Sequence, residues 1–138
     1  MAGFSTSLAN AIINATLRGQ AFPAIRTTYF ALFTADPTDA FTAGTEVSAA
    51  WYQRKATGAF AAPANGVSYN GVNVEFPPVI GSPVTVTHIG IVEGASPTDP
   101  TATLLYSEAL PTPKTLTVND IYAVRSQGAS GDFTLTLV

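Results

Sequence analysis

The sequence predicts a mainly β protein, an antiparallel β-sandwich or barrel-like domain preceded by one N-terminal α-helix. Only one segment, close to the N-terminus, carries apolar residues at helical spacing. From Pro23 onward, short runs rich in Val, Ile, Thr, Tyr and Phe alternate with Gly, Pro, Asn and Asp, which is the pattern of strands and turns. The 138 residues contain no cysteine, so disulfides and thiolate metal sites are excluded and stability depends on packing or oligomerisation.

The predicted helix runs from Phe4 to Arg18. Ser5 is the expected N-cap and Gly19 the expected C′ residue. Ile13 and Leu17 widen the apolar face, so the helix either lies deep in the fold or contacts both its own domain and a neighbour. The chain therefore divides into an N-terminal helix with its connecting arm, residues 1–25, and a β-sandwich domain, residues 26–138. The apolar stripe of the helix consists of Phe4, Leu8, Ile12 and Ala15.

About six to eight strands are expected, with turns about every eight to twelve residues. The first, Thr27 to Thr34, is apolar on both faces, as is typical of a central strand covered on both sides. The segment Glu46 to Thr57 is expected to hold one or two short strands, and Val67 to Tyr69 a turn or strand fragment. Glu93 to Thr101, with its two prolines, is expected to form an exposed loop. The remaining expected strands are Val72 to Phe76, Val84 to Val92, Ala102 to Ser107, Lys114 to Val118 and Phe133 to Leu137.

Charge is scarce: charged residues make up 11% of the chain, against about 25% in an ordinary soluble domain. Either partner chains cover much of the surface, because interface cores are depleted of Lys, Glu and Asp, or Thr, Ser and Asn solvate it. The net charge is −3 and the basic residues are scattered apart from Arg54 and Lys55, so direct nucleic-acid binding is not expected. No apolar run approaches the roughly 20 residues of a membrane span.

Residue types that carry chemistry are present but do not form a catalytic pattern. His88 is the only histidine, lies within a predicted strand and has no nucleophile elbow near it, so we interpret it as a hydrogen-bonded sheet residue. Asp36, Asp39 and Glu46 lack the spacing of a helix-loop-helix calcium loop, and the two aspartates are better interpreted as turn-formers. We therefore expect no enzyme activity, no cofactor and no bound metal.

Trp51, Tyr52 and Arg54 form an aromatic and guanidinium cluster of the kind enriched in interface hot spots. The alternative is that Trp51 or Tyr52 packs in the core while Arg54 reaches water. Because charges are so few, we expect Arg54 and Glu46 to form a pair.

Several short motifs in a fixed order resemble those of a family of small tailed-phage virion proteins, whose members are labelled tail fibre protein or head decoration (capsid cement) protein. The resemblance covers the chain from Tyr29 onward. It departs at Asn119, where similar proteins usually have Gly, and at Val92-Glu93, where a Phe-Asp pair is frequent. The motifs are Ala31-Leu32-Phe33-Thr34, Asp36-Pro37, Thr45-Glu46-Val47-Ser48 with Tyr52 and Arg54, Val86-Thr87-His88-Ile89-Gly90-Ile91, Leu104-Leu105, Leu110, Pro113-Lys114 and Asp120.

The resemblance implies a structural protein of the virion, assembled in the cytoplasm of the bacterial host. The compact chain, without a coiled-coil or repetitive shaft, favours a homotrimeric decoration protein that binds the phage major capsid protein. A tail fibre or tail-tip module involved in host attachment is the alternative. In either case the residues expected at the interface are Phe4, Leu8, Ile12, Trp51, Tyr52 and Arg54.

Overall fold

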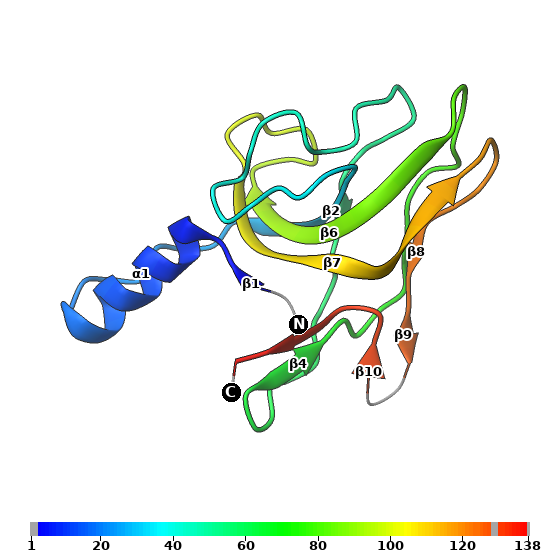
Figure 1. Cartoon of the computed structure of the whole chain (residues 1–138). Coiled ribbons are helices and arrows are strands. Elements are labelled where there is room, and N and C mark those ends of the chain that lie inside the picture. Colours follow the sequence, from blue (N-terminus) through cyan, green and yellow to red (C-terminus); the bar gives the residue numbers. More distant parts are fainter. Residues whose placement is uncertain (1–2, 128–129, 138) are drawn as a thin grey trace.

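The computed structural model describes residues 3–127 and 130–137, and it confirms a mainly β protein with one N-terminal helix (Figure 1). All strand pairs are antiparallel. The elements are β1 (Gly3–Phe4), α1 (Thr6–Leu17), β2 (Thr27–Phe33), β3 (Lys55–Ala56), β4 (Val67–Tyr69), β5 (Val74–Glu75), β6 (Val84–Gly94), β7 (Thr103–Leu116), β8 (Ala123–Val124), β9 (Ser126–Gln127), β10 (Ser130–Gly131) and β11 (Thr134–Thr136).

The central sheet has the strand order β1-β7-β6-β2-β3. Strand β2 was expected to be covered on both faces, and this is confirmed, because its residues alternate between two apolar clusters. Phe30 and Leu32 face the larger cluster, while Tyr29, Ala31 and Phe33 face the smaller one. The pairs β4·β11 and β9·β10 lie on one side of the sheet, and long loops lie on the other (Figure 1).

Helix α1 is shorter than predicted because Ser5 is its N-cap. The Ser5 Oγ accepts a hydrogen bond from the Leu8 N–H at 3.1 Å. Phe4 is therefore outside the helix: it lies in β1, paired with Tyr106 of β7, and the two rings are 5.7 Å apart. The expected stop is confirmed, since Gly19 has a φ of +63°, a conformation open to glycine.

The C-terminal half of the hairpin β6·β7 differs from the prediction. The strands expected at Ala102 to Ser107 and Lys114 to Val118 are one strand, β7, which runs through Pro111 and Pro113. The pairing register shifts between His88↔Ala109 and Val86↔Lys114, so both prolines lie in an irregular stretch. On its other side, within the described residues, β7 pairs with β1 at Tyr106 and Ser107. Prolines are tolerated at such edges and bulges because no ladder N–H is required there.

The segment Glu46 to Thr57 was expected to hold one or two short strands, and it holds one, Lys55–Ala56. The strand predicted at Val72 to Phe76 is shorter than expected, Val74–Glu75. In the first case a turn containing Trp51 inserts its side chain into the core instead of extending along β2. In the second, Val72 is 41% exposed whereas Val74 and Phe76 are buried, so the apolar alternation begins too late for a longer strand.

Asn119 has a φ of 75°. The turn it occupies is closed by hydrogen bonds from the Asn119 N–H to Val79 O (2.8 Å) and from the Asp120 N–H to Thr117 O (2.9 Å). Asn is the side chain that tolerates this left-handed conformation best after glycine. The left-handed turn that a Gly would allow at this position is therefore also open to Asn119.

Candidate functional site

The Glu46–Arg54 pair predicted from the sequence is confirmed, with bidentate geometry. Arg54 Nη2 lies 2.7 Å from Glu46 Oε1, and Arg54 Nε lies 2.7 Å from Glu46 Oε2. The Arg54 side chain is only 12% exposed, and its remaining terminal nitrogen donates to the Asp99 carbonyl at 3.1 Å. Hydrogen bonding to Glu46 raises the pKa of Arg54, so the guanidinium stays charged and fixed.

Tyr52 connects this pair to the central sheet. Its hydroxyl accepts a hydrogen bond from the Leu32 N–H at 3.1 Å and donates to Glu46 Oε2 at 3.2 Å. Burial, with the charge of Glu46 as a smaller cause, raises the pKa of Tyr52 far above its ordinary value. The Tyr52 hydroxyl thus provides a hydrogen-bond partner for a backbone N–H of β2 that lies beyond the pairing with β3.

Trp51 lies in the core, with 7% of its surface exposed. Its ring meets that of Tyr52 edge-on at 5.9 Å, and Tyr52 in turn stacks on Phe76 at 6.0 Å. The structure therefore places Trp51 as the core alternative describes, while Tyr52 and Arg54 remain partly accessible beside it. An interface role for Tyr52 and Arg54 stays a prediction.

A second ionic network, which sequence reasoning missed, centres on Asp99. Arg26 binds Glu93 through Nη2 at 2.8 Å and Asp99 through Nη1 at 3.0 Å. Asp99 also accepts from the N–H groups of Ala95 and Thr101, each at 2.8 Å. These backbone bonds, the Thr101 hydroxyl and Arg26 lower the pKa of Asp99 to about 2, and Arg26 likewise lowers the pKa of Glu93.

Together the two networks hold segments 46–54 and 95–102 against the central sheet, since the Asp99 carboxylate binds Arg26 and the Asp99 carbonyl binds Arg54. The segment Glu93 to Thr101 was expected to be an exposed loop. This is wrong for Glu93 and Asp99, which are each 8% exposed. A pocket of about 280 Å³ between the segments is lined by Glu46, Arg54 and Pro97 among others. Because both arginines already bind carboxylates, we interpret the cluster as a structural brace.

The three interface residues expected near the N-terminus have different environments. Leu8 is buried, with 5% exposure, and joins the larger core cluster. Phe4 and Ile12 are half-buried and pack against that cluster. These residues attach one side of α1 to its own domain. The opposite side of the helix faces away from the domain.

The opposite side of the helix carries Ile13 and Leu17, which we call the N-terminal surface. Phe22 and Ile25, in the connecting segment, line a pocket with Leu8 and Ala11 on the other side of the helix. The exposed fractions are 51% for Ile13, 81% for Leu17, 45% for Phe22 and 43% for Ile25. Figure 1 shows α1 extending away from the strands, with the connecting segment 18–26 returning beside it. The sequence signal for this surface was the widened apolar face of the helix.

A second group of exposed apolar residues consists of Ile80, Val118 and Ile121. They lie at the open end of the β6·β7 hairpin, just before β6 begins and just after β7 ends; we call this group the hairpin-end surface. Hydrogen bonds from the Val79 N–H to Asp120 O and from the Asn119 N–H to Val79 O join the two segments that carry it. In Figure 1 this end of the molecule lies away from α1.

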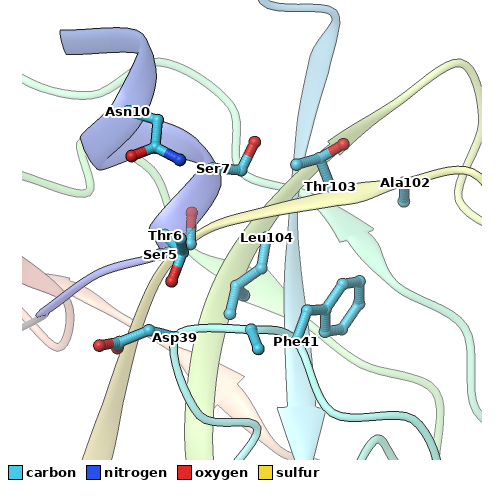
Figure 2. A pocket seen from close by; sticks show the side chains of 10 residues that line it. Ser5, Thr6, Ser7, Asn10, Asp39, Phe41, Ala102, Thr103 and Leu104 are labelled. Atoms are coloured by element: carbon cyan, nitrogen blue, oxygen red, sulfur yellow. The ribbon is translucent and has the colours of Figure 1, made fainter. Parts of the chain in front are cut away.

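A shallow pocket of about 460 Å³ lies where α1 begins (Figure 2). Ser7 and Asn10 of the helix and the ring of Phe41 lie around it, with Leu104 between them. Phe41 has a φ of 58°, and its ring packs edge-on against Phe33 at 6.2 Å. The pocket offers hydroxyl and amide groups for hydrogen bonding beside an aromatic wall.

His88 is a hydrogen-bonded sheet residue, as predicted. Its Nδ1 lies 2.8 Å from Thr87 Oγ1, and its Nε2 lies 4.0 Å from Asp36 Oδ1. Asp36 is a turn-former, accepting from the Thr38 N–H at 2.8 Å. Within residues 3–127 and 130–137, His, Asp and Glu side chains form no group of three or more that could hold a metal ion. No helix in this part of the chain is long and apolar enough to cross a membrane.

A comparison with protein families gives the context of these surfaces. The family model described as Podophage GP4 fiber I protein gp80 matches residues 3–131 of the 138. The chain belongs to this family. The resemblance to phage virion structural proteins is thereby confirmed, and the family description agrees with the tail fibre label among the two that the resemblance offered. A search of curated proteins finds no match.

Proposed function

We propose that this chain is a non-catalytic component of a phage tail fibre, that it works as a homotrimer, and that it is attached to the particle through its N-terminal helix and arm. The observation that carries the proposal is the family match over residues 3–131, because it covers almost the entire described structure and not one motif.

The internal construction of the chain supports a mechanical role. Arg54 and Arg26 bind carboxylates and hold loops against the sheet, and the longest strand carries two prolines in its irregularly paired stretch. Prolines and irregular pairing prevent a free edge from adding strands of other chains. A virion component that is held next to neighbouring chains needs this protection, since its contacts must be limited to defined surfaces.

The N-terminal surface is the best attachment region on the described residues. Ile13 and Leu17 project from a helix whose other face is already fixed to the domain through Leu8. In contrast, two of the residues expected at the interface, Trp51 and Leu8, are buried in the core. We propose that Phe4, Ile12, Tyr52 and Arg54 contribute at the margins of contacts and that Ile13 and Leu17 form their centre.

The second candidate is a capsid decoration protein that binds between subunits of the major capsid protein. The observation in its favour is the compact body, which has no extended shaft in the described residues. Such a protein would bury apolar surface at local three-fold positions of the shell.

The number of copies per particle separates the two candidates. Quantitative mass spectrometry of purified virions, with the major capsid protein as internal reference, is expected to give a copy number far below that of the capsid protein. A copy number close to that of the capsid protein would overturn the fibre proposal in favour of decoration. Absence of the chain from purified particles would overturn both.

A further inference from the structure

The chain contains two copies of the tripeptide Asn-Gly-Val, at residues 65–67 and 70–72. Asparagine followed by glycine is open to deamidation, in which the backbone nitrogen of the glycine attacks the side-chain carbonyl carbon of the asparagine. Glycine favours this attack because it has no side chain to hinder it. Since the asparagine is followed by the same two residues in both copies, the local sequence gives them similar reactivity. Any difference between them must come from the fold.

The first copy forms an exposed hairpin turn. Asn65 and Gly66 have φ values of 52° and 74°, and the N–H groups of Ala64 and Val67 each donate to the carbonyl of the other residue at 3.0 Å. This is the two-residue loop that Asn-Gly favours. Asn65 is exposed, and within residues 3–127 and 130–137 neither its side chain nor the Gly66 N–H takes part in a hydrogen bond. The electrophile and the nucleophile are both accessible here.

In the second copy, hydrogen bonds hold both reacting groups. The Asn70 side chain is fully buried, its Oδ1 accepts from the Phe133 N–H at 3.0 Å, and its Nδ2 donates to the Val72 carbonyl at 3.3 Å. The Gly71 N–H, which would be the nucleophile, donates to the Ala59 carbonyl at 3.0 Å. Attack at Asn70 would have to break these bonds and admit water to the core.

The cost of local opening separates the two copies. Ring closure needs room for the asparagine backbone and side chain to rotate, so the rate depends on how easily each segment opens. The tip of a hairpin opens at low cost, because few contacts are lost there. A segment whose polar groups are buried and paired opens at a much higher cost, because those groups lose their partners.

We propose that Asn65 is a deamidation site of the folded protein and that Asn70 is protected. The Gly66 nitrogen loses its proton to hydroxide and forms a bond to Cγ of Asn65. The Cγ–Nδ2 bond breaks, and the departing nitrogen takes up a proton from water and leaves as ammonia. Water then opens the cyclic imide at either carbonyl, which gives aspartate or isoaspartate. The inference concerns the chain itself and does not rest on the fibre proposal.

The products alter this turn. Each adds one negative charge to a chain whose net charge is −3. Isoaspartate also routes the main chain through the former side chain, so the two hydrogen bonds between Ala64 and Val67 cannot both keep their geometry. The same turn binds the C-terminal segment, since the Gly66 carbonyl accepts from the Leu137 N–H at 2.8 Å. Modification is therefore expected to loosen the pairing of β4 with β11 at this end.

The test is an ageing experiment on the purified full chain in mildly alkaline buffer, with one sample folded and one unfolded in denaturant. Peptide mass spectrometry follows the amide-to-acid conversion at each asparagine, so the two Asn-Gly-Val copies serve as controls for each other. In the folded protein we expect Asn65 to convert at least about tenfold faster than Asn70. In the unfolded chain we expect the two to convert at similar rates.

Asn65→Asp is the matched variant, because it carries the charge of the product from the start. On ion exchange it marks where the aspartate product elutes, and on ageing it should gain no acidic species at the wild-type rate. Equal rates at Asn65 and Asn70 in the folded protein, or faster conversion of Asn70, would overturn the proposal. So would a folded Asn65 that stays intact after the unfolded chain has converted. A preference for Asn65 that persists in denaturant would also contradict it, since the sequence and not the fold would then select the site.

Discussion

Individual acidic residues in this chain serve the backbone more than the surface. Asp36, Asp99 and Asp120 each accept a hydrogen bond from a nearby N–H group at 2.8 Å. Glu46 and Glu93 each bind one arginine at two points. With so few charges, this use leaves little ionic solvation for the exterior. The first interpretation of the low charge, a surface that partners cover, is consistent with that distribution.

The carboxylate of Asp99 predicts a sensitivity to acid. Its pKa falls from 3.8 to about 2 on folding, so its bonds stabilise the fold above the ordinary pKa and are lost as the pH falls through the folded value. We expect the melting temperature of the wild type to decrease between about pH 4 and pH 2. Asp99→Asn should melt lower than the wild type at pH 7 and change less over that interval.

Asp39→Asn is the matched control for Asp99→Asn, because Asp39 is an exposed aspartate in a loop. Its melting temperature should follow that of the wild type at each pH. If Asp99→Asn has the same acid dependence as the wild type, Asp99 is not the group responsible.

Trp51 provides a test of core against interface. Because it is 7% exposed and packs against Tyr52, Trp51→Ala should lower the free energy of unfolding by about 3–5 kcal/mol. Val118→Ala, at a residue 48% exposed, should change it by no more than about 0.5 kcal/mol. If Trp51→Ala dissociated an oligomer and left the free energy of unfolding unchanged, Trp51 would be an interface residue, contrary to the structure.

At the residue scale, the sequence predicted interactions between residues close together in the chain and missed those between residues far apart in it. Ser5, Gly19 and the Glu46–Arg54 pair lie within eight residues of their partners or act on their own backbone. Arg26 binds residues 67 and 73 positions away. No spacing rule joins positions so far apart; the network exists because β2 and β6 pair at Thr27↔Gly94.

Among the elements, the β6·β7 hairpin determines how the sheet is built. The strand predicted at Val84 to Val92 matches β6 nearly to its ends, whereas β7 joins the two strands predicted at Ala102 to Ser107 and Lys114 to Val118. Pro111 and Pro113 lie between those two segments, and proline cannot donate a ladder hydrogen bond. What the sequence pattern does not reveal is which strand is an edge. The described pairing of β7 with β1 lies at Tyr106 and Ser107 and not at the prolines, so a continuous strand is compatible with them.

Gly90 lies where β6 and β7 approach each other closely. A Cβ built on Gly90 would lie 2.8 Å from the Tyr106 carbonyl oxygen and 3.0 Å from the Phe33 ring. Gly90→Ala should therefore destabilise the protein by about 1–3 kcal/mol, as overpacking of a tight core does. Denaturant unfolding measures this.

The control for Gly90→Ala is Gly3→Ala on β1, where the added carbon would meet only the Ser107 carbonyl oxygen, at 3.9 Å. This variant should retain wild-type stability. Equal unfolding midpoints for both alanine variants would mean that β6 and β7 do not approach at Gly90 as the structure shows.

For the whole molecule, composition and periodicity predicted the fold class, and the family match supplies the virion. The arrangement of two apolar surfaces at separate ends of the body, the N-terminal surface and the hairpin-end surface, is a property that only the folded chain reveals (Figure 1). The sequence ranked decoration above fibre because it lacks a shaft. A compact module attached at one end, however, is also how a short segment of a fibre could be built.

The most direct test of this account is a cryo-electron microscopy reconstruction of the virion that carries this protein, resolved well enough to place its curved β6·β7 hairpin and projecting helix. We predict density of this shape in a tail-associated fibre, with α1 on the side attached to the particle, and none over the capsid lattice. Density of this shape at the three-fold positions of the shell, and absent from the tail, would contradict the account.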